Sequence, residues 1–171
     1  RDETSEMPGY NIRPAVIVMP GGGYRWCSKR EADPVAVQFL QAGYQVFTLY
    51  YTVAPAPLRW QPLMDAAGAV MYLRQNAAAL RLDPGRVVVA GFSAGGHLAA
   101  STAILWDAAP VQQALGITGT EARPNAVVLG YPVITAGEFA HRGSFDSLCG
   151  DDAELLRTMS LENQVRPGLP P

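Results

Sequence analysis

The sequence predicts an α/β fold in which a mostly parallel sheet is covered by helices on both faces. Two observations carry this prediction. Short apolar runs rich in β-branched residues recur along the chain between Gly and Pro residues, as expected for strands buried on both faces. Segments of helical character separate these runs and are long enough for crossovers between parallel strands. With no internal repeat or linker, we expect residues 1–171 to form a single domain.

Turn-forming residues bracket the first predicted strand and the first predicted helix. The run PAVIVM, residues 14–19, is short, β-branched and bounded by Pro and Gly, so it predicts a buried strand. Asp33 and Pro34 supply an N-cap and a proline in the first turn, and Gly43 supplies a stop. A helix is therefore expected over residues 34–42.

The next pair of elements follows directly. QVFTLYYT, residues 45–52, predicts a second strand and leads into a Pro-rich loop. A helix is expected over residues 62–80, because Leu63, Ala67 and Val70 fall on one face at helical spacing.

The second half of the chain repeats the alternation. VVVAGF, residues 87–92, predicts a third buried strand that runs straight into an Ala-rich helix over residues 94–105. NAVVLGYPV, residues 125–133, predicts a fourth strand. A last helix is expected over residues 151–159, where three acidic residues in the first turn complement the helix dipole.

The composition excludes several classes of partner. Of the 171 residues, 49% are hydrophobic and 16% charged, and the net charge is −2 with no cluster of Lys or Arg. A packed core is expected and nucleic-acid binding is not. No apolar run reaches the roughly 18 residues of a membrane span, and Cys27 and Cys149 have neither disulfide-framework nor metal-ligand spacing. We expect a cytoplasmic protein without a metal site, with secretion left open because the sequence begins without Met or a signal core.

A serine nucleophile is predicted at GFSAGGHL, residues 91–98. A strand followed by G-x-S-x-G and then a helix places the serine on a strained turn above the carboxyl edge of the sheet. Gly91 and Gly95 are expected because a larger side chain would collide where strand and helix approach closely. Ser93 is therefore the candidate nucleophile.

Acyl transfer also needs N–H donors aimed at the developing oxyanion. The N–H of Ala94, immediately after the nucleophile, is one candidate. PGGGY, residues 20–24, follows the first strand and ends on the same edge of the sheet, so the N–H groups of Gly22 and Gly23 are the others. A glycine trio alone would indicate a flexible turn, but here two motifs converge on one edge.

These motifs carry a family resemblance over about residues 14–166. The segments PAVIVMPGGGY, YYTVAPAP, VVVAGFSAGGHLAAS and NAVVLGYPVITAGEFAHRGS resemble the α/β-hydrolase family of bacterial acetyl esterases and lipases, in its acetyl-xylan-esterase-like branch related to hormone-sensitive lipase. The resemblance implies a three-layer α/β-hydrolase fold and hydrolysis of short-chain esters, often acetyl groups on plant sugars, without a cofactor. It implies Ser93 as nucleophile and Gly22, Gly23 and Ala94 as oxyanion donors, with Pro20 where the family's HGGG motif has His.

Neither histidine fits the role of general base well. His97 lies one turn inside the helix that begins at the serine, whereas a base normally comes from a separate loop facing the hydroxyl. We expect His97 to pack or hydrogen-bond within the helix layer. His141 follows the fourth strand without the intervening acid, strand and helix of the expected order Ser, acid, His, so it is expected as a loop residue near the substrate, with a role as base left open.

The resemblance implies that the triad Asp and His follow SLENQVRPGLPP and are not in this chain. The chain is then the central portion of the fold, incomplete at both ends, and nearly inactive alone. An uncovered sheet edge would favour self-association or complementation by the C-terminal segment. Two alternatives stay open: a peptidase or arylformamidase on the same fold, and an inactive fragment that acts only through association.

Five further side chains carry weaker expectations. Asp65 and Glu31 are expected to cap a helix or to pair with a neighbouring Arg. Tyr24, Trp26 and Trp60 line an acyl or sugar pocket or belong to the core, and the sequence favours neither.

Overall fold

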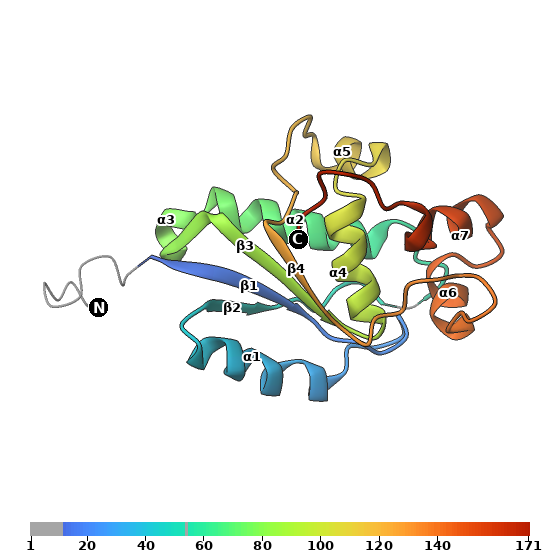
Figure 1. Cartoon of the computed structure of the whole chain (residues 1–171), viewed down its shortest axis with the longest axis horizontal. Coiled ribbons are helices and arrows are strands. Elements are labelled where there is room, and N and C mark those ends of the chain that lie inside the picture. The colour runs from blue at the N-terminus through green and yellow to red at the C-terminus, as the bar shows by residue number, and fades with distance from the viewer. Residues whose placement is uncertain (1–11, 54) are drawn as a thin grey trace, which may run out of the picture.

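The computed structural model describes residues 12–53 and 55–171. Its sheet has the strand order β2-β1-β3-β4, and every neighbouring pair is parallel. The strands are β1 (Arg13–Met19), β2 (Gln45–Thr48), β3 (Leu82–Phe92) and β4 (Ala126–Gly130). Because the strands are parallel, their carboxyl ends meet at one edge, where Figure 1 shows the loops that follow them.

Helices cover both faces of this sheet. The α-helices are α1 (Asp33–Gln41), α2 (Gln61–Gln75), α3 (Ala77–Leu80), α4 (Ala94–Ile104), α5 (Ala109–Leu115), α6 (Arg142–Leu148) and α7 (Ala153–Met159). In Figure 1, α1 lies on one face and α2 and α4 lie on the other. The predicted three-layer α/β fold is confirmed.

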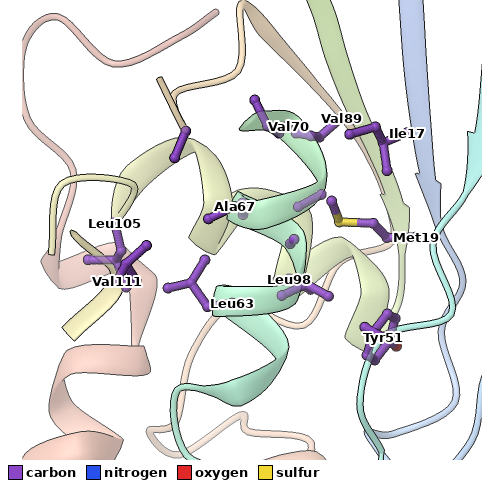
Figure 2. Packing of buried hydrophobic residues seen from close by; sticks show 14 of the residues in the cluster. Ile17, Met19, Tyr51, Leu63, Ala67, Val70, Val89, Leu98, Leu105 and Val111 are labelled. Carbon is purple, nitrogen blue, oxygen red and sulfur yellow. The ribbon is translucent and has the colours of Figure 1, made fainter. Parts of the chain in front are cut away.

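The alternating side chains of β1 build two cores. Val16 and Val18 point to the α1 face and pack with Phe39 of that helix. Ile17 and Met19 point to the opposite face, where the larger core contains residues of β3, α2 and α4 (Figure 2). A strand buried on both faces has no place for a polar side chain, which explains the uninterrupted apolar run.

Several predicted boundaries were wrong. The helix expected over residues 62–80 is two helices, because Asn76 leaves helical geometry and its side chain donates a 2.8 Å hydrogen bond to the carbonyl of Tyr72. β3 begins five residues earlier than expected, since Leu82 pairs with Arg13 ahead of a register shift. The strand expected over residues 45–52 ends at Thr48.

The remaining differences lie in the second half. The strand expected over residues 125–133 ends at Gly130, and the last helix begins at Ala153 with Asp152 as its N-cap, accepting from the N–H of Leu155 at 3.0 Å. α5 and α6 were not predicted at all. Both are only seven residues long, too short to show a clear helical period.

Candidate active site

Ser93 occupies a strained turn between β3 and α4. Its φ of 53° and ψ of −120° lie outside the regions that non-glycine residues ordinarily adopt. The end of β4 and the loop after it hold this turn through two backbone hydrogen bonds. The N–H of Ser93 donates to the carbonyl of Gly130 at 3.1 Å, and the N–H of Val133 donates to the carbonyl of Ser93 at 3.0 Å. The side chain is half-buried rather than sealed in the core.

The glycines around Ser93 allow the close approach that the motif predicts. A Cβ atom on Gly91 would collide with the carbonyl oxygen of Gly95. A Cβ atom on Gly95 would in turn collide with the carbonyl oxygens of Met19 and Pro20. These contacts are with backbone, which cannot rotate away, so the expected steric requirement for both glycines is confirmed.

The triple-glycine loop lies against the serine. A Cβ atom on Gly21 would be only 2.9 Å from the Cβ of Ser93. Gly22 and Gly23 follow with φ values of 132° and 65°, conformations that favour glycine. Together with Ser93 they line a pocket of about 270 Å³, so the two motifs singled out in the sequence meet at one site.

The backbone N–H groups of the loop divide into two kinds. That of Gly21 donates a 2.7 Å hydrogen bond to Oε2 of Glu31. Within residues 12–53 and 55–171, no group accepts a hydrogen bond from the N–H of Gly22, Gly23 or Ala94. These three are the donors expected for an oxyanion, and no described residue uses their N–H groups.

His97 belongs to a buried hydrogen-bond network. Its side chain is 1% exposed, and Nε2 lies 2.8 Å from the carbonyl of Met159, an acceptor only, so Nε2 carries the proton. Nδ1 therefore accepts from the hydroxyl of Tyr24 at 2.7 Å. Burial lowers the pKa of His97 to about 4. With both nitrogens engaged and the ring neutral, His97 has the hydrogen-bonding role predicted for it.

This network also explains how the glycine loop is held. The hydroxyl of Tyr51 donates to the carbonyl of Pro20 at 2.6 Å, just before the glycines, and Tyr24 bonds to His97 just after them. Sequence reasoning missed both anchors, because hydrogen bonds over such separations leave no periodic pattern. Burial raises the pKa of Tyr24 and of Tyr51, so both hydroxyls remain protonated donors.

His141 is brought to the pocket, as expected for a loop residue near the substrate. It lies in the pocket wall with Gly22, Gly23 and Ser93. Its ring is exposed, and Nδ1 is 2.8 Å from the hydroxyl of Ser144.

The aromatic candidates separate into different environments. Tyr24 is core and Trp26, 59% exposed, lines the pocket. Trp60 packs against the core and lines a separate pocket that contains Asp152.

The two carboxylates bind groups that the sequence did not indicate. Asp65 accepts from the N–H of Thr52 at 2.8 Å and from the side chain of Gln61 at 2.9 Å. Glu31 binds Gly21, and it also accepts from the hydroxyl of Tyr131 at 2.9 Å. The expectation that they cap a helix or pair with Arg was wrong, since backbone N–H groups and neutral side chains compete for the same oxygens.

The described residues offer neither a cluster of metal ligands nor a membrane-spanning helix. Residues 12–53 and 55–171 contain no group of three or more His, Cys, Asp or Glu side chains placed to hold a metal ion. None of the helices in this part of the chain is long and apolar enough to span a bilayer. Cys27 and Cys149 are free thiols.

A parallel sheet between helical layers, with a strained serine after a central strand and a glycine loop beside it, defines an α/β-hydrolase. The chain belongs to the BD-FAE family, whose model matches residues 6–163. It is 38% identical over 166 residues to endo-1,4-beta-xylanase B of Butyrivibrio fibrisolvens, a match that covers 93% of this chain and 26% of the relative. It is 31% identical to the acetylxylan esterase of Xylanibacter ruminicola, over 92% of this chain and 31% of the relative.

A solved structure agrees in both fold and sequence. The acetyl ester-xyloside bifunctional hydrolase of Caldicellulosiruptor lactoaceticus superposes with a TM-score of 0.82 at 36% identity. The match covers 99% of this chain and 61% of that chain. The chain thus spans about three fifths of this structure and about a third or less of the two curated relatives.

Proposed function

We propose that the protein is a serine carboxylic-ester hydrolase that acts on short-chain acetyl esters, including those of plant carbohydrates. The single observation that carries this proposal is the position of Ser93 on a strained turn beside free N–H groups. The printed functions of the acetylxylan esterase and of the acetyl ester-xyloside hydrolase support the choice of an acetyl ester.

The geometry supports an acyl-enzyme mechanism. The hydroxyl of Ser93 attacks the ester carbonyl while a base takes its proton, and the N–H groups of Gly22, Gly23 and Ala94 stabilise the negative charge that develops on oxygen. The alcohol leaves with that proton. Water then attacks the acyl group on Ser93, regenerating the serine and releasing the carboxylic acid. The helix dipole of α4 adds partial positive charge at the same point.

The general base is proposed to lie outside residues 1–171, with the triad acid. His97 is excluded by its buried bonds to Tyr24 and Met159. His141 lies in the pocket wall, but its Nδ1 is 2.8 Å from Ser144, and no described carboxylate orients its ring. Residues 1–171 alone are therefore expected to turn over esters at a nearly undetectable rate.

The outer edge of β4 is the proposed binding place of the complementing segment, or of a second copy of the chain. Val128 and Leu129 are exposed on this outermost strand of the described sheet. The carbonyl of Pro171 accepts from the N–H of Val127 at 2.8 Å, but no further described strand pairs with this edge, and an edge strand favours strand addition. Sedimentation of purified residues 1–171 tests self-association. A strictly monomeric species at all concentrations would contradict binding of a second copy and leave the complementing segment as the proposed occupant.

The test of the mechanism is replacement of the nucleophile in the active protein. Ser93→Ala should lower kcat for an acetyl ester by about 10⁴-fold or more, because triad residues act as a unit. His141→Ala, which removes the alternative base, should lower it by less than about tenfold. Full turnover by Ser93→Ala would disprove the nucleophile, and a loss as large in His141→Ala would identify that residue as the base.

Substrate class is tested separately. A panel of acetyl-xylan fragments, p-nitrophenyl acetate, a formyl anilide and a proline peptide should show hydrolysis of the two acetyl esters. Exclusive cleavage of the amides would replace this proposal with a peptidase or arylformamidase.

A further inference from the structure

Glu31 connects the ends of two strands across the serine. It ends the short 3-10 helix at Lys29–Glu31 and is half-buried in the pocket wall. Its Oε2 accepts from the N–H of Gly21 at 2.7 Å, and its Oε1 accepts from the hydroxyl of Tyr131 at 2.9 Å. Gly21 follows β1 and Tyr131 follows β4, whereas Ser93 follows β3 between them. One carboxylate therefore spans the edge of the sheet on which the nucleophile sits.

The contact with Gly21 leaves little free space. A Cβ atom on Gly21 would be 2.5 Å from Oε2 of Glu31 and 2.9 Å from the Cβ of Ser93. The glycine backbone is thus packed between the carboxylate and the serine. Gly22 and Gly23 follow immediately, so a displacement of Gly21 would move their N–H groups relative to Ser93.

The negative charge of Glu31 lies close to the place where the proposed oxyanion would form. A negative side chain beside developing negative charge is electrostatically unfavourable, so Glu31 needs a compensating role. Both of its oxygens accept hydrogen bonds from groups of this chain. The bond to Gly21 also determines which N–H groups of the loop can bind a substrate. It engages the N–H of Gly21 and leaves those of Gly22 and Gly23 available.

Tyr131 is itself held in an unusual backbone conformation. Its φ of 36° is rare for a side chain of this size, and its ring stacks at a tilt on Phe92, the residue before Ser93, with ring centroids 5.8 Å apart. The hydroxyl thereby reaches Glu31 from the β4 side of the strained turn at Ser93. The carboxylate is fixed at both oxygens rather than at one.

We propose that Glu31 is a positioning residue of the ester hydrolase, which holds the glycine loop at the distance from Ser93 that oxyanion binding requires. This inference rests on the proposed function. Glu31 exchanges no proton with the substrate. It acts through the N–H of Gly21, and its effect reaches the reaction by way of Gly22 and Gly23.

Replacement by glutamine separates positioning from proton transfer. Glu31→Gln keeps an oxygen that accepts from Gly21 and a side-chain amide that donates to the hydroxyl of Tyr131, yet it cannot act as a base. Glu31→Ala removes both bonds, and Glu31→Asp keeps the charge but is one methylene too short to span both partners. Glu121→Ala is the matched control, because Glu121 lines a different pocket beside Arg74.

The experiment measures kcat, KM and inhibition by a trifluoromethyl ketone, which forms an oxyanion adduct with a serine, in the active protein. Glu31→Ala and Glu31→Asp should lower kcat by about 10- to 100-fold, as expected when reacting groups shift by a fraction of an ångström, with KM within about threefold. The affinity for the inhibitor should fall by the same factor as kcat/KM. Glu31→Gln should retain kcat within about threefold with an unchanged pH profile, and Glu121→Ala should match the unmodified protein.

Each result decides the matter. If Glu31→Gln is as inactive as Glu31→Ala, the negative charge or a proton transfer matters and the positioning role is wrong. If Glu31→Ala and Glu31→Asp both keep full activity, the contact is without consequence. Should Glu31→Ala fail to fold, the comparison of Asp with Gln still decides. Loss of activity in Ser93→Ala, with no effect at Glu31, would refute this inference and leave the proposed function intact.

Discussion

The two sides of Ser93 differ in how firmly the chain builds them. On the β1 side, the glycine loop is anchored at three residues within PGGGY: Pro20 by a tyrosine hydroxyl, Gly21 by a carboxylate and Tyr24 by a buried histidine. Each anchor comes from a different segment. On this side, the proposed oxyanion-binding loop is therefore fixed by side chains of the described residues.

The β4 side is open by comparison. Val128 and Leu129 are 44% and 40% exposed on the strand itself, and Phe139 in the following loop is 87% exposed. The N–H of Val127 finds its acceptor at 2.8 Å in the carbonyl of Pro171 rather than in a neighbouring strand. The difference teaches that the chain itself fixes the glycine loop, where we propose oxyanion binding, whereas the outer strand next to Ser93 is covered by fewer contacts.

The largest effect is expected at Gly91, where β3 approaches the backbone of α4. Gly91→Ala would force a methyl group into the backbone of Gly95, a contact that no rotamer relieves. The free energy of unfolding should fall by more than about 4 kcal/mol, or the protein should fail to fold. Chemical denaturation followed by circular dichroism measures this.

A second glycine shows what the same substitution does where no clash arises. Gly68 lies within α2, and a Cβ atom there would make only an ordinary contact, 3.6 Å from Cδ2 of Leu115. Gly68→Ala should therefore stabilise the protein by about 0.5 to 1 kcal/mol. Equal destabilisation by the two substitutions would show that the approach of β3 and α4 is not as close as the structure has it.

Features set by local sequence pattern were predictable, whereas the long-range hydrogen bonds that anchor the glycine loop were not. The strand β3 and the strained turn at Ser93 were predictable, because VVVAGFSAGG combines a continuous apolar run with glycines that close contacts require. The position of the glycine loop followed from the rule that parallel strands end at one edge. Local pattern carries this kind of information.

The anchors of the loop were not predictable. Glu31 was expected to pair with Arg or cap a helix, and nothing in its neighbours indicates that Gly21 and Tyr131 converge on it. His97 was expected in a structural role, but its partner Tyr24 is 73 residues away. Such bonds depend on the packing of whole elements, which no single periodicity encodes.

An intermediate effect on the free energy of unfolding is expected from pH, through His97, which anchors the glycine loop by way of Tyr24. His97 is neutral when folded, and burial lowers its pKa from about 6.5 to about 4. The unfolded chain therefore binds a proton between these values that the folded protein does not, so stability falls as pH decreases through this window. The shift corresponds to roughly 3 kcal/mol lost between pH 7 and pH 4.

Urea unfolding at a series of pH values measures this loss. In His97→Asn the titrating group is gone, so the slope of stability against pH should flatten between pH 6.5 and pH 4, although the variant is less stable throughout. His141→Asn leaves His97 and its hydrogen bonds to Tyr24 and Met159 in place, so it is the matched control for replacing a histidine. An unchanged slope in His97→Asn would mean that other groups cause the acid sensitivity.

The smallest expected effects are the losses of stability when one valine in β3 and one in the neighbouring β4 are each replaced by alanine. Val89 in β3 is fully buried, whereas Val128 in β4 is 44% exposed. Substitution by alanine removes the same atoms and the same strand propensity at both positions, so the difference reports burial alone. Val89→Ala should cost about 2 kcal/mol through lost burial and a residual cavity, and Val128→Ala less than about 1 kcal/mol. If a further segment or a second copy covers β4 in solution, the cost at Val128 would rise towards that at Val89, and the rise would depend on protein concentration only for a second copy.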